Sequence, residues 1–205
     1  MLNELWLGEL AEMVTRREQK ERTRKHLIEV ALMVFADKGF GATRTVDIAR
    51  AASVAHGTVF THFPTRDELL CAVIEAFAQR LIRRIAELAE GGAGVREVLR
   101  AHLDGLREHE QFYVRLISER SLLPPMARTT LIGIQSVISI HLSQAARADE
   151  ARGRLRELEP HLLFNTWMGL LHYYLTQGDL FAPGESVIER RGQEILDHYV
   201  RLLTP

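Results

Sequence analysis

The sequence predicts an all-α protein, in which an N-terminal three-helix, helix-turn-helix domain is followed by a larger C-terminal helical bundle. Two observations support this prediction. Apolar residues recur at spacings of three and four through most of the chain, which is the period of an amphipathic helix. No segment alternates apolar and polar residues with the period of two that a half-buried strand requires.

The composition is typical of a folded globular protein of moderate size. The chain has 205 residues, 46% of them hydrophobic, and a formal net charge of -1, so it can bury a substantial core. No run approaches the ~18 apolar residues of a transmembrane helix, and the first residues lack a secretory signal pattern. Cys71 is the single cysteine and is expected to be a small buried hydrophobe. We therefore expect a cytoplasmic protein with no cofactor, no bound metal and no membrane contact.

Positive charge is concentrated near the N-terminus. Residues 15–66 carry ten Lys or Arg and five Asp or Glu, a net charge of +5, so the rest of the chain is acidic at -6. Such a block is expected where a segment contacts phosphates, because neutralising phosphates releases counterions. The charges alone fit a solvated helix face equally well. The order of the helices in the same segment must therefore distinguish DNA binding from a plain charged surface.

The first long helix is predicted from its ends. Apolar residues in 2–14 recur near helical spacing and indicate either an extra amphipathic helix or a mobile arm. Thr15 and Glu18 have the spacing of a capping box, in which each side chain satisfies a free backbone N–H at a helix start. The helix is expected to begin there and to run to Lys38, where Gly39 supplies a left-handed stop.

Two short helices and a tight turn follow. Thr45 is expected to cap the first, with Asp47 placed favourably against the helix dipole. The second is predicted from His56 to Phe63, with Val59 and Phe63 facing inward together. Three helices of this size and order form a helix-turn-helix, whose third helix can enter the major groove of DNA.

The rest of the chain continues the helical pattern. A second capping box, Thr65 to Glu68, opens a fourth helix that ends at the glycine-rich residues 91–94. Further breaks are predicted at Pro124-Pro125, near Gly153, at Pro160, at Gly178 and at Pro183-Gly184.

The segment from Thr45 to Leu70 resembles a known DNA-binding segment. It contains a threonine followed by an Ile-Ala pair, a Gly-Thr pair at the start of its second helix, a terminal Phe-Pro, and Arg-Asp-Glu-Leu opening the next helix. These features are similar to those of the tetracycline-repressor (TetR) family of transcriptional regulators, and the similarity extends back to Arg22. The resemblance implies an extension at 1–15, a DNA-binding domain at 16–64, and a ligand-sensing and dimerisation domain at 65–205.

Three positions depart from the family pattern. Ser53 stands where the turn usually has glycine, so a left-handed backbone there is strained. Ala55 replaces a serine and removes a capping hydroxyl from the third helix. Phe60 replaces a tyrosine and lacks the hydroxyl that commonly reaches a phosphate.

The third helix and two helix N-termini are expected to contact DNA. Thr61 and His62 are expected to face base edges, while Thr45 and Arg66 are expected to hold phosphates without contributing sequence preference. The full set of expected DNA contacts is Thr45, His56, Gly57, Thr58, Phe60, Thr61, His62 and Arg66.

For the C-terminal helices the resemblance implies a small-molecule pocket and a homodimer. Residues 162–175 are apolar nearly all round, so they are expected to pair with the final helix, 185–203, across a two-fold axis. For each candidate pocket residue a plain core role is an open alternative. The candidates are His102, Phe112, Arg115, His141, Trp167, Met168 and His172.

The sequence therefore predicts a transcriptional repressor that a small-molecule ligand releases from a palindromic operator in double-stranded DNA. A helix-bundle enzyme is one alternative, because Glu157 and His161, and Glu194 and His198, are spaced four apart. The Glu-x-x-His pairs of a di-metal bundle are missing, as are the common nucleophile and phosphate-binding motifs, so we expect no catalytic residues. A non-regulatory DNA-architectural protein is the other alternative, but it would not explain the large helical remainder.

Overall fold

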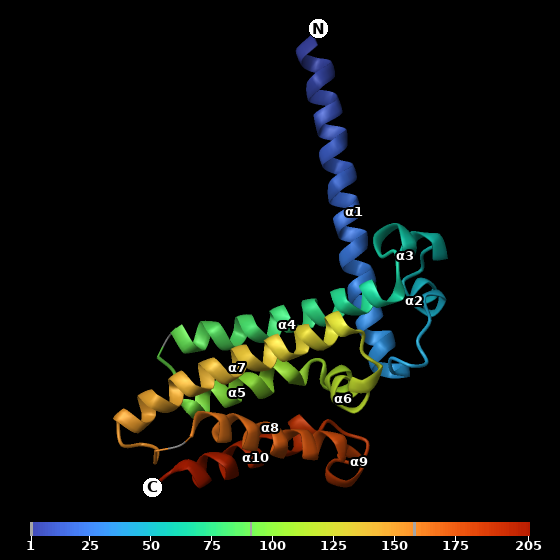
Figure 1. Ribbon diagram of the computed structural model, residues 1–205. Helices are drawn as coiled ribbons and strands as arrows, with labels where there is room; N and C mark the ends of the chain where they lie inside the picture. Colours follow the sequence, from blue (N-terminus) through green and yellow to red (C-terminus); the bar gives the residue numbers. More distant parts are fainter. Residues whose placement is uncertain (1, 91, 158) are drawn as a thin grey trace.

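The computed structural model is helical throughout the residues it describes, which are 2–90, 92–157 and 159–205 (Figure 1). Side chains are described from residue 15 onward, except at 84 and 88–90. No strand occurs in these ranges, as the all-α prediction requires. The helices are α1 (Leu2–Lys38), α2 (Thr45–Ala51), α3 (His56–His62), α4 (Arg66–Glu90), α5 (Val95–Arg107), α6 (Glu110–Ser118), the 3-10 turn η1 (Arg120–Leu122), α7 (Pro125–Ala151), α8 (Pro160–Thr176), α9 (Gly178–Phe181) and α10 (Val187–Leu203).

The helices form a layered body from which one helix projects. In Figure 1, α4, α5 and α7 lie side by side, α8 and α10 lie below them, and α1 rises from one end beside α2 and α3. The most extensive helix contacts are those of α4 with α7 and α5, followed equally by those of α1 with α6 and of α5 with α10. The C-terminus lies at the other end of the body from α2 and α3.

The predicted start of the first helix at Thr15 is wrong, because α1 runs without a break from Leu2 to Lys38. The preceding turns already supply carbonyl acceptors to the backbone N–H groups of residues 15–18, so no cap is needed there. The predicted end is confirmed. Gly39 has φ +80° and its N–H donates to the carbonyl of Phe35 at 2.9 Å.

The C-terminal end of α1 is held by α6. The last carbonyls of a helix have no partner inside the helix. Here the Nε of Arg115 donates to the carbonyl of Ala36 at 3.2 Å, and its Nη2 donates to that of Asp37 at 3.0 Å. Its remaining nitrogen, Nη1, donates to the Glu119 carboxylate at 3.1 Å. Arg115 thus joins two helices, where the sequence suggested a ligand contact.

Glu119, directly after α6, also holds the residues that follow α1. Its Oε2 accepts from the backbone N–H of Phe40 at 2.7 Å, and a side chain at Gly39 would collide with its carboxylate. Phe40 is fully buried and packs edge-on against Phe35 and Phe112. The end of α1 is therefore fixed by hydrogen bonds around a buried aromatic anchor.

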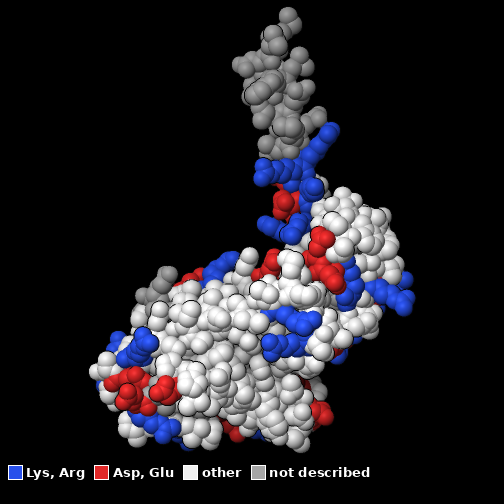
Figure 2. All heavy atoms as spheres, in the orientation of Figure 1, with Lys and Arg blue, Asp and Glu red and all other residues white. Residues whose placement is uncertain are grey.

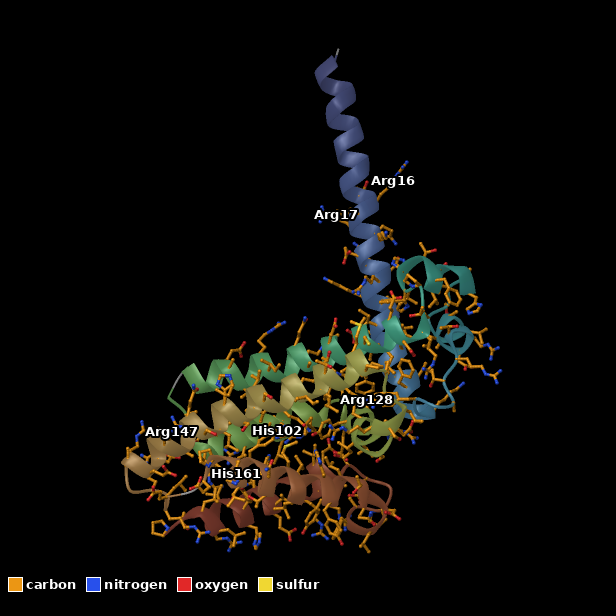
Figure 3. The ribbon with its side chains drawn as sticks, viewed as in Figure 1. Arg16, Arg17, His102, Arg128, Arg147 and His161 are labelled. Carbon is orange, nitrogen blue, oxygen red and sulfur yellow. The ribbon has the colours of Figure 1, made fainter. Side chains whose placement is uncertain are left out.

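The interior of the body contains one fully buried histidine. His102 on α5 lies inside the bundle (Figure 3), and its Nδ1 accepts from the indole Nε1 of Trp167 at 3.0 Å. Burial, with a smaller contribution from nearby His172, lowers the pKa of His102 from 6.5 to about 3. The imidazole is therefore neutral in the folded protein at ordinary pH.

We predict that Glu119→Ala destabilises the fold by about 1–3 kcal/mol, because it strands the Phe40 N–H and one nitrogen of Arg115 without an acceptor. Urea unfolding measures the change. Glu119→Gln keeps one acceptor oxygen and should lose less. Glu108→Ala, at a side chain 78% exposed, is the control. A loss no larger than that of the control would contradict the structural role of Glu119.

We predict that His102 makes the protein less stable as the pH falls below 6.5. The pKa of His102 is about 3 in the folded protein and has its ordinary value of 6.5 in the unfolded chain, so between these values the unfolded chain binds the extra proton. Stability should therefore fall by up to about 1.4 kcal/mol per pH unit in this window and be fully present above it. His102→Asn keeps an acceptor near Nδ1 but cannot titrate. Urea unfolding at pH 7.5 and 5.5 should give a smaller pH difference for this variant, and equal differences would refute the assignment.

Candidate nucleic-acid interface

The turn between α2 and α3 has a left-handed residue, as expected. Ser53 has φ 55°, and its N–H donates to the carbonyl of Arg50 at 3.1 Å. A left-handed conformation costs a residue other than glycine about 1–2 kcal/mol. Ala55 occupies the N-cap of α3 and makes no side-chain capping bond, which confirms the lost hydroxyl. The helix-turn-helix is therefore formed without two of its usual local stabilisers.

The N-cap of α2 is Arg44, so the prediction of Thr45 as the cap is wrong. The Asp47 carboxylate accepts from the Arg44 N–H at 3.1 Å and pairs with the ammonium of Lys38 at 3.0 Å. The Lys38 hydrogen bond, with that of the Arg44 backbone, lowers the pKa of Asp47. Thr45 lies in the first turn instead, with its hydroxyl 3.0 Å from Nε2 of His56 at the start of α3.

One side of α3 is open to solvent. Gly57 and Thr61 are exposed, and a side chain at Gly57 would meet nothing within 4 Å. Phe60 is 43% exposed and lies edge-on to His56, with ring centroids 5.0 Å apart. Val59 points the opposite way and is fully buried. Gly57, Thr61, Phe60 and His56 thus form a surface that a major groove could receive.

His62 is placed differently from the prediction. A helix turns about 100° per residue, so His62 lies only about 60° from the buried Val59. Its side chain faces α1, where it is partly buried and its Nδ1 has no hydrogen-bond partner among the described residues. Desolvation, followed by the nearby charges of Lys20 and Arg24, lowers its pKa. His62 therefore lies between α3 and α1, away from the outward surface of α3.

Arg66 is also engaged within the protein. Its Nε donates to the carbonyl of Thr43 at 2.9 Å, and its Nη2 donates to the carbonyl of Phe40. The guanidinium lies over the ring of Phe35, 5.6 Å from its centroid. These contacts tie the start of α4 to the turn after α1. Arg66 is therefore positioned to orient the helix-turn-helix, and few of its donors remain for a phosphate.

Basic side chains extend this surface along α1. Figure 2 shows Lys and Arg gathered on the projecting part of α1, above the body and beside the white surface of α3. The residues concerned are Arg16, Arg17, Lys20, Arg22, Arg24 and Lys25, of which all but Arg24 are exposed and Arg24 is partly buried.

The candidate ligand residues fall into two groups. His102, Trp167 and Met168 are buried in the packed interior, and His172 nearby shares a hydrogen bond of 2.8 Å with the hydroxyl of Tyr113. Phe112 and Arg115 lie apart from them, toward α1. Phe112 lines a cleft of about 750 Å³ between α1, the α5–α6 corner and the segment around α9, and Arg115 lines a neighbouring cleft of about 430 Å³.

His141 belongs to neither group. It lies partly buried on α7, and its Nδ1 has no hydrogen-bond partner in the part of the chain that the structure describes. His141 therefore lies on a largely apolar face of α7, and it lines neither of the two clefts described above.

The spacings that suggested a metal enzyme do not form a site. Glu157 lies before α8, which begins at Pro160, so it does not share a helix with His161. Glu194 and His198 share α10, where Glu194 pairs with Arg191 at 2.9 Å. Residues 15–205, where their side chains are described, contain no group of three His, Cys, Asp or Glu arranged to hold a metal. The described helices are all too short or too polar to cross a membrane.

Sequence reasoning missed the polar residues that connect the helices. Glu119 and Tyr113 were not singled out, and neither was Asp149, which is buried and accepts from the Val95 N–H at 2.9 Å. The only sequence signal was the four-residue spacing of Arg115 and Glu119, which indicates no more than a pair on one helix.

Comparisons with known proteins agree with this geometry. The family model described as "Bacterial regulatory proteins, tetR family" matches residues 27–73. The uncharacterised HTH-type regulator YerO of Bacillus subtilis is 31% identical over 50% of this chain and 36% of its own length. RutR of Escherichia coli is 25% identical over 73% of both chains. The match spans about a third of YerO and of YuxN, another B. subtilis relative.

Solved structures show the same fold over nearly the whole chain. The reduced form of E. coli NemR has a TM-score of 0.73 at 19% identity, covering 90% of this chain and 98% of that one. PfmR of Thermus thermophilus has a TM-score of 0.71 at 20% identity, covering 86% and 96%. The comparisons therefore agree with the predicted resemblance: residues 27–73 match the tetR family model, and the chain shares the fold of PfmR, a TetR-family transcriptional regulator.

Proposed function

We propose that this protein is a sequence-specific DNA-binding transcriptional regulator, a homodimeric repressor that a small molecule releases from a palindromic operator. The observation that supports this proposal is the outward surface of α3, where Gly57 and Thr61 are exposed, in a domain whose first helix is basic where it projects from the body (Figure 2). We propose residues 16–64 as the DNA-binding domain and 65–205 as the sensing and dimerisation domain, and we assign no catalytic step to either. Selection from random duplexes on the purified protein tests this, since a palindromic consensus is expected.

The proposed DNA contacts follow the exposed surface. Gly57, Thr58 and Thr61 are assigned to base edges, with Phe60 in apolar contact beside them. His56 and Thr45, which are hydrogen-bonded to each other, are assigned to the backbone at the N-terminal end of α3. His62 and Arg66 are assigned to positioning α3 against α1 and α4, because their side chains are turned toward the protein.

The effector is proposed to act through α6. A cleft of about 750 Å³ is within the usual size of a ligand pocket, and Phe112 on α6 lines it. The adjacent Tyr113 reaches the interior through His172, and the Nε2 of buried His102 lacks a partner among the described residues. Arg115 and Glu119 on the same helix hold the end of α1. A ligand that moves α6 would therefore move α1, α2 and α3, in proportion to its differential affinity for the two conformers.

A structural neighbour supports the proposal that one protein of this fold binds both DNA and a small molecule. AibR, with a TM-score of 0.69 at 18% identity, was solved in complex with isovaleryl coenzyme A and operator DNA. That complex supports the view that the fold can hold both kinds of partner.

The proposed dimer interface is the outer face of α8. Leu162 and Tyr173 are 53% and 56% exposed, and Gly169 lies between them with open space beside it. Large exposed apolar side chains on both sides of a glycine allow the helices of two subunits to approach closely. A two-fold axis through this face would place α8 and α10 of both subunits together.

We predict that Thr61→Val relaxes operator preference without unfolding the protein. The Thr61 hydroxyl bonds only to the Gly57 carbonyl of its own helix, so the fold should be unaffected. Loss of one base contact should cost about 1–3 kcal/mol of discrimination between operator and scrambled duplexes. Thr129→Val on α7, whose hydroxyl bonds to Pro125 in the same way, is the control. Equal discrimination in both variants would mean that another face of α3 meets the DNA.

We predict that Gly169→Arg gives a folded monomer. Beyond its chain neighbours and the backbone of its own helix, a Cβ added at Gly169 meets no atom of the same chain within 4 Å, so an arginine side chain can extend outward into the space that a second subunit would occupy. Gly133→Arg on α7 has equally open surroundings and should remain dimeric. Light scattering at micromolar concentration, with circular dichroism to check folding, distinguishes them. A dimeric Gly169→Arg variant would place the interface elsewhere.

A further inference from the structure

The projecting part of α1 has two faces of different charge. At about 100° per residue, Arg16, Arg17, Lys20 and Arg24 fall within an arc of about 100°. The same arc contains Leu27 and Ala31, which are buried one and two turns further along. The face that packs into the protein is therefore apolar inside the body and cationic where the helix leaves it.

The opposite face of the same segment is electrically mixed. Glu18, Glu21, Arg22 and Lys25 point there, two acids and two bases, and all four are exposed. A helix that merely needs solubility would interleave both signs on both faces. The sorting of charge by face indicates that the cationic face meets an anionic partner.

The cationic face is directed toward the end of α3. The guanidinium of Arg24 lies over the ring of Phe63, 4.9 Å from its centroid. Lys20 and Arg24, together with Glu21 at the border of the two faces, are all close enough to His62 to act on its ionisation, and the two cations lower its pKa. Figure 3 shows Arg16 and Arg17 extending to either side of α1 one turn further out, where they form the two edges of this face. The cations thus continue from the helix-turn-helix outward along α1.

We propose that this face, centred on Arg17 and Lys20, binds the phosphate backbone of the DNA that flanks the groove entered by α3. The inference rests on the proposed function, because α3 must be in a groove for α1 to lie against the adjoining strand. Residues 16 to 24 span about 12 Å of helix, enough to follow two or three phosphates. Such contacts add affinity for any sequence and strengthen the hold of α3 on its operator.

The test compares two variants that remove the same charge from the same stretch of helix. Arg17→Gln with Lys20→Gln removes two of the four cations of the cationic face, and Arg22→Gln with Lys25→Gln removes both cations of the mixed face. Glutamine is a good helix former and all four side chains are exposed, so both variants should melt at the temperature of the unmodified protein. Binding is measured from 50 to 200 mM salt on the selected operator and on a scrambled duplex.

Loss of two phosphate contacts should lower the slope of log affinity against log salt by about 1.8 in the cationic-face variant. The factor by which this variant binds DNA more weakly than the unmodified protein should then be about tenfold larger at 50 mM than at 200 mM salt, on both duplexes. The mixed-face variant should keep a slope within about 0.5 of the unmodified protein. Equal slope changes in the two variants, or none in the first, would overturn the inference.

Failure of the proposed function gives a different result. An unmodified protein that selects no consensus would refute sequence-specific regulation. The slopes on the scrambled duplex would still decide whether the cationic face binds phosphates, because that contact does not depend on sequence.

Discussion

The attachment of the end of α1 to α6 is the constraint on which the rest of the arrangement depends. Helix α1 packs against α2, and α2 packs against α3, so the orientation of α2 and α3 depends on that of α1. Phe40, fully buried between Phe35 and Phe112, supplies most of the energy, since truncating such a side chain typically costs about 3–5 kcal/mol. The bonds from Arg115 and Glu119 contribute less but fix the direction in which the helix leaves the body.

Helix α4 is connected to α1 at two places, through Arg66 at the turn after α1 and through the more exposed Arg80 further along. Arg80 on α4 pairs with Glu29 on α1, and its Nη1 lies 3.0 Å from Nε2 of His109 at the α5–α6 corner. The side chains of Arg80 and Glu29 are 40% and 47% exposed, and exposed pairs contribute about 0–1 kcal/mol at most. The position of α4 is therefore set by its apolar packing on α5 and α7. The end of α1 is therefore held from two sides, by Arg115 and Glu119 of the α6 region and by Arg66 of α4.

The helix-turn-helix itself is stabilised more by burial than by local sequence preference. Ser53 adopts a left-handed conformation and Ala55 leaves α3 without a capping side chain. Val59 and Phe63 compensate because they are 0% and 2% exposed, and complete burial of such side chains contributes about 1.5–3 kcal/mol each. The buried side of α3 therefore holds the helix in place, while Gly57, Phe60 and Thr61 on its other side remain exposed.

The sequence by itself determined the features that depend on neighbouring residues. Helical periodicity, the stop at Gly39 and the buried face of α3 follow from spacing and backbone preference within a few residues. The TetR-like segment predicted, in the same local way, the match of residues 27–73 to the tetR family model. Only the tertiary structure decided the roles of Arg66, His62, Arg115 and Glu119. Glu119 meets Phe40 across 79 positions of the chain, and its partner is a backbone N–H that every residue but proline possesses. A contact to the backbone leaves no mark on the identity of its partner, so no pattern in the sequence could reveal it.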